Sequence, residues 1–330
     1  MIKFQALVVE EIEDGKFIRS VKEKEISSIP ENHLLIKVKY SSLNYKDALS
    51  ARGHKGISRN YPHTPGIDAA GIIAESKSDI FKSGDEVIVT GYDLGMNTNG
   101  GFGQYIVVPA DWAVRLPKGL SLEESMIYGT AGFTAAICIY ELQKHDITPE
   151  KGKILVTGAT GGVGSMAVGL LANLGYEVTA STGKAEHHDF LKSLGATEII
   201  SREMIDDNSG RPLLSGKWIG AVDNVGGNTL ATVIKSIGQH GCICVLGNVA
   251  GDKFTSTVYP FLLRGIILAG IDSASRPMEL RKILWEKLAG DWKFHKLNDT
   301  YKIVTLDKIN DEIDNILKGE QVGRVVLNLW

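Results

Sequence analysis

Short segments in which hydrophobic and polar residues alternate run through residues 1–120, with glycine and proline between them. Alternation over strand-length runs, bounded by turn-forming residues, predicts β-strands joined by turns. The segments with this composition are "FQALVVEEI", "HLLIKVKYSSL", "AAGIIAES", "DEVIVTG" and "GQYIVVPA". We therefore expect a largely antiparallel β domain at the start of the chain.

From about residue 123 the pattern changes, and apolar runs of strand length alternate with longer segments of helical character. This alternation predicts an α/β fold built on a doubly wound parallel sheet. The predicted strands are 154–157, 177–180, 198–201, 219–223, 242–246 and 266–269. The predicted helices are 125–140, 163–174, 185–194 and 229–237.

The tail begins with a predicted helix, "MELRKILWEKLAGD", and continues as strand, helix and strand to "GRVVLNL". We expect its last strand to return to the N-terminal domain. A chain of 330 residues is long for one core and suggests two domains. We assign residues 1–122 and 272–330 to the first domain, and residues 123–271 to the second.

The segment "ILVTGATGGVGS", residues 154–165, joins a predicted strand to a predicted helix through a glycine-rich turn. Gly161 would let backbone N–H groups approach a pyrophosphate, and Gly164 would let the helix pack closely on the strand. The N-terminus of the helix adds free N–H donors and partial positive charge. We interpret the turn as a dinucleotide site; the alternative is a tight strand–helix connection without a ligand.

The second predicted strand and the residues after it read "EVTASTGKAEHH", in which no acidic residue follows Glu177 until Glu186. Sites for NAD usually place Asp or Glu there to bind the ribose 2′-hydroxyl. Ser181, Thr182 and Lys184 occupy that place instead, and Arg202 follows the third strand. Hydroxyl groups and cations suit a 2′-phosphate, so the sequence favours NADPH over NADH. The alternative is that Lys184 and Arg202 are solvated surface charges.

Bulk properties exclude some kinds of partner. The net charge is −3 and the pI is about 6.3, which favours neither nucleic acid nor an anionic membrane. The N-terminus lacks the features of a signal peptide, and the uncharged stretch 125–140 is too short and too polar to span a bilayer.

The chain has three cysteines, Cys138, Cys242 and Cys244, and the last two form a C-x-C in a predicted strand. They could be a redox or metal-binding pair, although two small core residues are the simpler interpretation. Such sparing use of cysteine suits a reducing cytoplasm.

Short-chain dehydrogenases share the pattern T-G-x-x-x-G-x-G, which "TGATGGVG" also fits. That family places the turn near its N-terminus and a catalytic Y-x-x-x-K far downstream. In this chain the turn is in the middle, and the sole Y-x-x-x-K, "YELQK", lies upstream at residues 140–144. The order of the motifs therefore disfavours this class.

A β domain, a nucleotide domain and a short returning tail together resemble the medium-chain dehydrogenase/reductases. The resemblance covers essentially the whole chain and rests on "SSLNYKDAL", "PGIDAAGII", "GDEVIV", "GTAGFTA", "VTGATGGVGS" and "LGA". It implies a GroES-like catalytic domain, mainly antiparallel β, and a Rossmann domain. The resemblance also implies a homodimer, and we expect the apolar region 241–270 to form its interface.

Zinc-dependent members of that family carry Cys in the segment that matches "LNYKD" and His-Glu in the segment that matches "GIDAAG". Asn44, Ile67 and Asp68 hold those places in this chain, and "YDLGMNTNGGFGQY" lacks the four cysteines of the structural zinc lobe. The resemblance is therefore to the zinc-free reductases, and we expect no metal site.

Within that branch, "SSLNYKDAL", "GTAGFTA" and "GIDS" look like the acryloyl-CoA reductase and quinone oxidoreductase subfamily. The resemblance implies that a set of residues spread along the chain lines the NADPH site. They are Tyr45, Thr160, Gly161, Gly162, Val163, Gly164, Ser181, Thr182, Gly183, Lys184, Arg202, Asn248 and Ser273.

The expected reaction is hydride transfer from NADPH to the β carbon of an activated C=C in a small enoyl thioester. Fixed hydrogen-bond donors can stabilise the resulting enolate. Tyr45 is the candidate proton donor or oxyanion contact, with Asn44 and Asp47 shaping the pocket. Alternatively, Tyr45 stacks on the nicotinamide while water supplies the proton, and Asp47 is a structural acceptor. The competing functions are quinone reduction and a non-catalytic NADPH-binding sensor.

Overall fold

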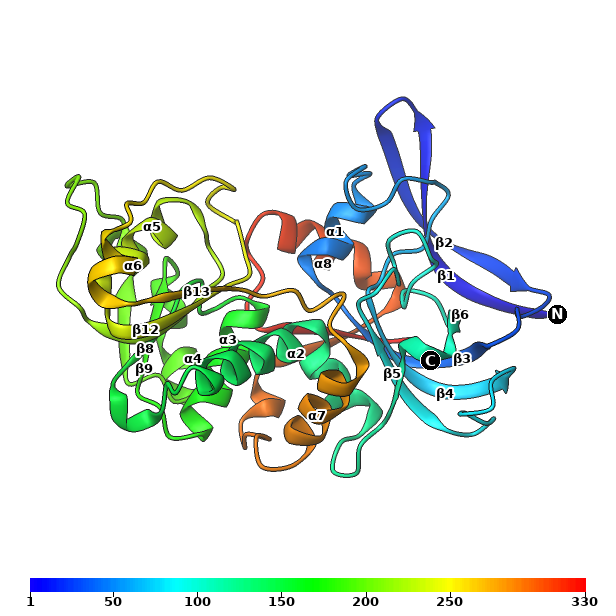
Figure 1. The fold of residues 1–330 in the computed structure, drawn as a ribbon. Helices are drawn as coiled ribbons and strands as arrows, with labels where there is room; N and C mark the ends of the chain where they lie inside the picture. The colour runs from blue at the N-terminus through cyan, green and yellow to red at the C-terminus, as the bar shows by residue number, and fades with distance from the viewer. The chain divides into compact units, whose positions relative to one another are not determined.

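The computed structural model describes residues 1–330. The chain divides into two compact units, shown in Figure 1. Unit 1 contains Met1–Thr130, Ser273–Gly290 and Asn298–Trp330, and unit 2 contains Ala131–Asp272 and Asp291–Leu297. The chain therefore leaves unit 1 twice, first to build most of unit 2 and then for the short segment Asp291–Leu297.

Unit 2 is built on a six-stranded parallel sheet in the order β10-β9-β8-β11-β12-β13. All six strands were expected from the sequence, with ends that differ by a few residues. Their bounds are β8 Ile154–Val156, β9 Val178–Thr182, β10 Glu198–Ser201, β11 Trp218–Asp223, β12 Ile237–Val245 and β13 Ile267–Gly270. The strand order reverses between β8 and β11, which is where doubly wound sheets open a crevice for a ligand.

The helices of unit 2 pack on this sheet. They are the second part of α2 (Leu122–Lys144), α3 Gly162–Asn173, α4 His188–Ser193, α5 Gly227–Ser236 and α6 Tyr259–Arg264. The single helix expected at 185–194 is instead a 3-10 turn, Ala185–His187, followed by the short α4. Leu155, Ala221 and Ile243 come from three neighbouring strands and join one buried core.

Unit 1 contains a seven-stranded sheet and a separate hairpin of β1 and β2. Its strands are β1 Ile2–Glu13, β2 Lys16–Ile26, β3 His33–Ser42, β4 Asp68–Ser76, β5 Glu86–Thr90, β6 Tyr105–Pro109, β7 Ala113–Arg115, β14 Tyr301–Thr305 and β15 Arg324–Asn328. All pairings in this unit are antiparallel except that of β14 with β15. The expected antiparallel β domain is confirmed.

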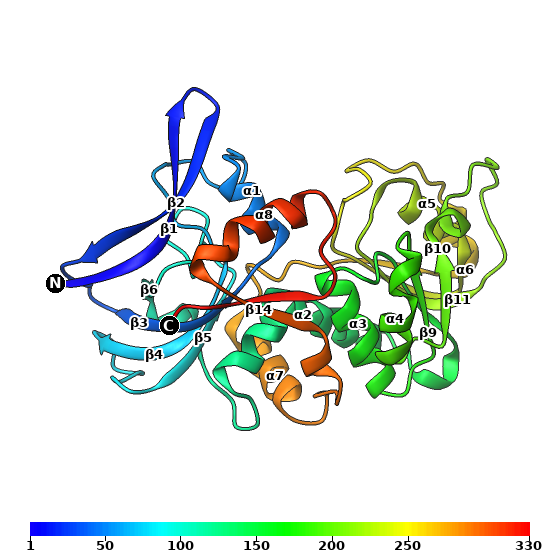
Figure 2. The ribbon, with the colours of Figure 1, turned by 180° about the vertical axis from the view of Figure 1, so that it is seen from behind.

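The helices of unit 1 are α1 Tyr45–Ala51, the first part of α2, α7 Met278–Ala289 and α8 Ile309–Leu317. The tail returns to the N-terminal strands as expected, because β15 pairs with β3 (Figure 2). Leu7, Val38, Val89 and Leu327 belong to the same buried core, although they are far apart in sequence. In neither unit is a helix long and apolar enough to cross a membrane.

Candidate active site

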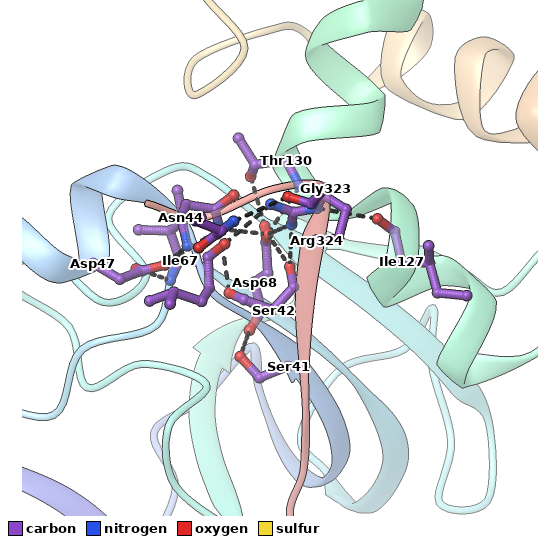
Figure 3. A network of polar contacts seen from close by, with 12 residues as sticks. Ser41, Ser42, Asn44, Asp47, Ile67, Asp68, Ile127, Thr130, Gly323 and Arg324 are labelled. Carbon is purple, nitrogen blue, oxygen red and sulfur yellow. Dashed lines mark hydrogen bonds and ion pairs between the residues drawn. The ribbon is translucent and has the colours of Figure 1, made fainter. Parts of the chain in front are cut away.

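A fully buried carboxylate, Asp68, is the centre of a polar network in unit 1 (Figure 3). It is the first residue of β4. Its Oδ2 accepts hydrogen bonds from Ser42 Oγ at 2.6 Å, Asn44 Nδ2 at 2.7 Å and the Thr130 N–H at 2.9 Å. Its Oδ1 accepts a hydrogen bond from Thr130 Oγ1 at 2.5 Å. These donors satisfy the hydrogen-bonding capacity of a carboxylate that has no contact with solvent.

Arg324, the first residue of β15, supplies the cation of this network. Its side chain is 1% exposed, and its Nη2 lies 3.9 Å from Asp68 Oδ2. The guanidinium donates to Ile127 O at 3.1 Å, Leu43 O at 3.0 Å and Ser42 Oγ at 2.9 Å. Burial lowers the pKa of Arg324 from its usual value, while Asp68 and Asp47 oppose that change. Arg324 thus connects the last strand to the segment that precedes α1.

Asn44 and Asp47 fix the start of helix α1. The Asp47 carboxylate accepts hydrogen bonds from the Asn44 N–H at 2.8 Å, the Ile67 N–H at 2.8 Å and Asn44 Nδ2 at 3.2 Å. The side chain of Asp47 reaching back to the residue before the helix is one half of a capping box. Through Asn44, whose amide also donates to Asp68, the helix is tied to the buried network.

Asp47 has an unusual proton affinity. The pKa of Asp47 is raised to about 7, chiefly by burial and to a smaller extent by the nearby charge of Asp68. Hydrogen bonds from Asn44 and Ile67 act in the opposite direction. The site thus holds two buried carboxyl groups and one guanidinium, and one of the two carboxyl groups changes its charge near neutral pH.

Tyr45 differs from its neighbours in this site because it is half exposed. It is the first residue of α1, and 50% of its surface is accessible to solvent. Its hydroxyl forms no hydrogen bond within the protein, whereas Asn44 and Asp47 on either side are buried. A phenol in this position can donate a hydrogen bond or a proton to a bound molecule.

Gly129 makes the network possible from helix α2. Its φ is 50° and its ψ is −155°, which interrupts the helix. A Cβ at this position would meet Ser42 Oγ at 2.4 Å, Asp68 Oδ2 at 2.6 Å and Arg324 Nη2 at 2.9 Å. Glycine is therefore needed both for the left-handed backbone and for the close approach, and the interruption directs the Thr130 N–H toward Asp68.

The glycine turn of unit 2 joins β8 to α3. Gly161 precedes the helix with no side-chain cap, so the first N–H groups of α3 have no side-chain acceptor. A Cβ on Gly164 would lie 2.3 Å from Gly158 O and 2.7 Å from Ala159 Cα. Gly158 itself has a φ of 58°. The turn is thus tight, with a bare helix N-terminus of the kind that binds phosphate groups.

Hydrogen bonds at the strand ends hold this turn in place. Thr157 Oγ1 donates to Asp223 Oδ1 at 2.8 Å, and Asn224 Nδ2 donates to Thr157 O at 2.7 Å. Asp223 Oδ2 accepts from the Gly226 N–H at 2.9 Å. These contacts join the carboxyl ends of β8 and β11, the two strands between which the sheet order reverses.

The residues expected at a 2′-phosphate lie together at the end of β9. Ser181 and Thr182 are its last two residues, and Thr182 Oγ1 lies 3.4 Å from Thr160 Oγ1 in the glycine turn. Thr182 also accepts a hydrogen bond from the Lys184 N–H at 3.0 Å. The Arg202 side chain covers Gly183, where a Cβ would lie 3.1 Å from Arg202 Cδ. Arg202 is 75% exposed and pairs with Glu203.

The remaining expected cofactor residues are divided between the units. Asn248 follows β12 in unit 2, and its backbone lies against Gly226, where a Cβ would meet Asn248 Cα at 3.0 Å. Ser273 and Tyr45 belong to unit 1. The carbonyl of Ser273 accepts a hydrogen bond at 3.0 Å from Arg281, a buried arginine of α7.

All three cysteines are buried free thiols. Burial contributes to raising the pKa of Cys242 and Cys244, where hydrogen bonding with neighbouring cysteines is the largest cause. Such thiols are unreactive, in agreement with core residues. No group of three His, Cys, Asp or Glu side chains comes together in the structure in a way that could hold a metal ion.

Asn44, Tyr45 and Asp47 are expected from the sequence, whereas most of the network around them is not. Asp68 was noted only for its place in a motif, and Ser42, Gly129, Thr130 and Arg324 were not assigned to a site. The motif "GTAGFTA" contains Gly129 and Thr130, so this motif could have assigned both residues to the site. Arg324, in "GRVVLNL", offered none, because its role depends on the pairing of the last strand.

Two family models match the chain: "Alcohol dehydrogenase GroES-like domain" at residues 30–118 and "Zinc-binding dehydrogenase" at residues 162–290. Acrylyl-CoA reductase AcuI of Ruegeria pomeroyi is 43% identical over 99% of each chain.

Two solved structures are also similar. The yhdH oxidoreductase from Salmonella enterica, in complex with NADP, has a TM-score of 0.95 and 40% identity, covering 99% of this chain and 100% of that one. Protein yhfP of Bacillus subtilis, with NAD bound, has a TM-score of 0.96 and 44% identity over 100% of both chains. With these full-length matches and the two sheets described above, the chain belongs to the medium-chain dehydrogenase/reductase family of oxidoreductases.

Proposed function

We propose that the protein is an NADPH-dependent reductase that saturates the activated C=C of a small enoyl thioester, similar to acrylyl-CoA. The observation that carries the proposal is the Tyr45 phenol, exposed and unpaired at the start of a helix that buried hydrogen bonds hold in place. The likeness to acrylyl-CoA reductase AcuI over the full chain supports this substrate class.

The residues of unit 2 fit NADPH. The bare N-terminus of α3 and the close turn at Gly164 suit the pyrophosphate, since a larger residue at Gly164 would collide with the turn. Ser181, Thr182, Lys184 and Arg202 would hold the 2′-phosphate, and the end of β9 carries no carboxylate that would repel it. When bound, NADPH supplies the hydride for the reduction.

The chain has to stabilise charge and deliver one proton. When the β carbon gains a hydride, the electrons of the C=C move toward the thioester oxygen and form an enolate. Tyr45 would donate a hydrogen bond to that oxygen, or a proton to the α carbon, to give the saturated thioester. The alternative is that Tyr45 stacks on the nicotinamide and water supplies the proton.

Asn44 and Asp47 position Tyr45 in this proposal. The Asp47 carboxylate accepts hydrogen bonds from Asn44 and Ile67, so its oxygens hold the first turn of α1. Asn44 links that turn to Asp68, and Arg324 offsets the buried negative charge. The network would thus keep the phenol in one orientation relative to the substrate.

Quinone reduction is the second candidate. The protein yhfP, a quinone oxidoreductase-like relative, is as similar to this chain as AcuI is. An exposed phenol and a dinucleotide site would serve a flat quinone as well as a thioester. A sensor that binds NADPH without turnover is the third candidate.

The deciding experiment is NADPH oxidation by the purified, metal-stripped protein with acryloyl-CoA and, separately, with a benzoquinone. Saturable turnover of acryloyl-CoA with slow quinone reduction is the expected result. Fast quinone reduction without thioester activity would transfer the function to quinones and leave the cofactor unchanged. NADPH binding without turnover of either acceptor would favour the sensor.

A homodimer formed through unit 2 is part of the proposal. Strand β13 lies at an open edge of the parallel sheet. Large apolar side chains in the segment between β12 and β13 are exposed: Val249, Val258, Leu262 and Leu263. A second copy that pairs with this edge across a two-fold axis would cover both the unpaired strand and the apolar side chains.

We also propose a reducing, cytoplasmic setting for the protein. Its three thiols are free and buried, and none forms a disulfide bond. Proteins of oxidising compartments carry disulfide bonds more often than cytosolic proteins do.

A further inference from the structure

Helix α1 presents one exposed face, which begins at Tyr45. Tyr45, Leu49 and Arg52 are four and seven residues apart, so they lie on the same side of the helix. Tyr45 and Arg52 are exposed and Leu49 is half-buried, whereas Asp47, Ala48, Ser50 and Ala51 are buried. At 1.5 Å per residue, this face extends about 10 Å from the candidate active site to Arg52.

A surface cavity of about 270 Å³ lies at the far end of this face. Three elements of unit 1 form its wall: the tip of the β1–β2 hairpin, the end of α1, and α8. Its lining residues are Gly15, Lys16, Phe17, Arg19, Ala51, Arg52, Asp314 and Leu317. The lining thus combines three cations and one aromatic ring with a single acid.

The charges around the cavity leave Arg52 available to a ligand. Arg19 pairs with Asp314 at 2.8 Å, and Lys16 lies 3.7 Å from Glu13, a long and exposed contact. Lys55, in the loop after α1, pairs with Glu11 at 2.7 Å. Arg52 has no acidic partner, although it lines the cavity and ends the exposed face of α1.

The chemical groups of an acyl-CoA are arranged in the same order as Tyr45, Leu49 and the cavity at Arg52. Its thioester is at one end of a flexible and mostly uncharged arm, and its diphosphate, 3′-phosphate and adenine are at the other end. A neutral arm suits Leu49, and phosphate groups suit an unpaired guanidinium, which can donate two parallel hydrogen bonds. The Phe17 ring offers an apolar wall to the adenine.

We propose that the cavity at Arg52 binds the phosphorylated nucleotide end of the acyl-CoA substrate, and that its arm lies along Leu49 to Tyr45. This inference rests on the proposed function, since it names how that substrate is recognised. It makes Arg52 a specificity residue for the CoA thioester rather than a catalytic residue.

The test compares two substrates with the same reactive end: acryloyl-CoA and acryloyl-pantetheine, which lacks the nucleotide. In Arg52→Ala, the KM for acryloyl-CoA should rise about tenfold with kcat nearly unchanged. The kinetic constants for acryloyl-pantetheine should stay as in the wild type. Lys82→Ala, which removes an exposed cation from the turn between β4 and β5, is the matched control and should change neither substrate. Equal effects of Arg52→Ala on both substrates, or none on either, would overturn the inference.

A binding measurement keeps this test separate from that of the proposed function. Adenosine 3′,5′-bisphosphate is titrated by calorimetry into wild type and Arg52→Ala in the presence of saturating NADPH, so that the cofactor site is filled. Wild-type binding that weakens about tenfold in the variant supports the subsite even if neither thioester is reduced. Absent binding, or equal binding by both proteins, argues against it even if acryloyl-CoA is a good substrate.

Discussion

Tyr45 is an exposed side chain whose position is fixed by buried neighbours. Asn44, Asp47 and Asp68 are buried, and Asn44 donates hydrogen bonds to both carboxylates, whereas the phenol of Tyr45 has no partner. Removing the phenol oxygen would therefore take away the reactive group without disturbing the network that orients it.

Tyr45→Phe is expected to lower kcat for acryloyl-CoA by roughly a hundredfold, because a positioned donor typically contributes at least that much. The Kd of NADPH should stay within about twofold, since the ring remains available for stacking. Steady-state kinetics and a fluorescence titration measure the two quantities. Tyr105→Phe, which removes a phenol oxygen from β6 of the same unit, is the control. Unchanged turnover in Tyr45→Phe would exclude the phenol from the chemistry.

Gly129→Ala should lower the stability of the folded protein by at least about 2 kcal/mol, because it combines a left-handed backbone with a collision. The added Cβ would lie 2.4 Å from Ser42 Oγ and 2.6 Å from Asp68 Oδ2. Gly210→Ala is the matched control: Gly210 has a φ of 71°, but a Cβ there meets nothing within 4 Å. Urea unfolding of both variants separates the two effects, and equal losses would show that the network tolerates the extra carbon.

The raised pKa of Asp47 predicts a particular dependence of stability on pH. Because the pKa of Asp47 is raised from 3.8 to about 7, the folded protein binds this proton more tightly than the unfolded chain does. Its contribution to stability is therefore largest below about pH 4, falls as the pH rises to about 7, and is constant above that. The difference in unfolding free energy between wild type and Asp47→Asn should fall from about pH 4 to about pH 7 and stay constant above that. A constant difference would mean that Asp47 titrates in its ordinary range.

At the scale of elements, the turn between β8 and α3 and the end of β9 bring the cofactor residues of unit 2 together. Thr160 and Thr182 are 22 residues apart in sequence, yet their hydroxyl oxygens lie 3.4 Å apart. This proximity follows from the parallel pairing of β8 with β9, since parallel neighbours end at the same edge of the sheet.

Arg202→Ala should raise the Kd of NADPH about tenfold and leave that of NADH within about twofold, because only NADPH carries the 2′-phosphate. Isothermal titration with each cofactor measures both constants. Lys192→Ala, an exposed cation of α4, is the control and should affect neither. A wild type that binds the two cofactors equally well would contradict the assignment of this cluster to the 2′-phosphate.

The sequence predicts the parallel sheet well because each strand is an apolar run set off by a helix or a turn. It fails at β2, where "KFIRSVKEKEI" is mostly charged and pairs with β1 without burying any residue of its own. It also fails at the interruption of α2, because the apolar pattern continues through Gly129. The candidate site was found only where a motif is local: Asn44 to Asp47 are consecutive, whereas Asp68, Thr130 and Arg324 meet them through tertiary contacts.

At the scale of the whole molecule, the two edges of the parallel sheet differ in how well they suit contact with another chain. Unit 2 has open edges at β10 and β13. Strand β10 carries Glu198 at its start and Ser201 at its end, while β13 reads "ILAG" and follows the exposed apolar residues of α6. The edge at β13 is apolar and unpaired, so it can pair with a strand of another chain unless it is covered.

Leu262→Glu should shift the protein from dimer to monomer, because it places a charge in the apolar surface beside β13, where Leu262 is 73% exposed. Light scattering coupled to size-exclusion chromatography measures the mass. Ile80→Glu, which changes a 62% exposed apolar residue of unit 1, is the control and should keep the wild-type mass. A monomeric wild type would contradict the proposed interface.

Arg324 lies six residues before the C-terminal Trp330, yet it completes a network whose other members lie between Ser41 and Thr130. During synthesis, the residues of unit 2 emerge before this arginine does. The buried carboxylate of Asp68 therefore lacks its cation until β15 has been synthesised. A nascent chain can assemble its parallel sheet before β15 emerges, but it can complete the surroundings of Tyr45 only afterwards, so we expect catalytic competence to follow the folding of unit 2.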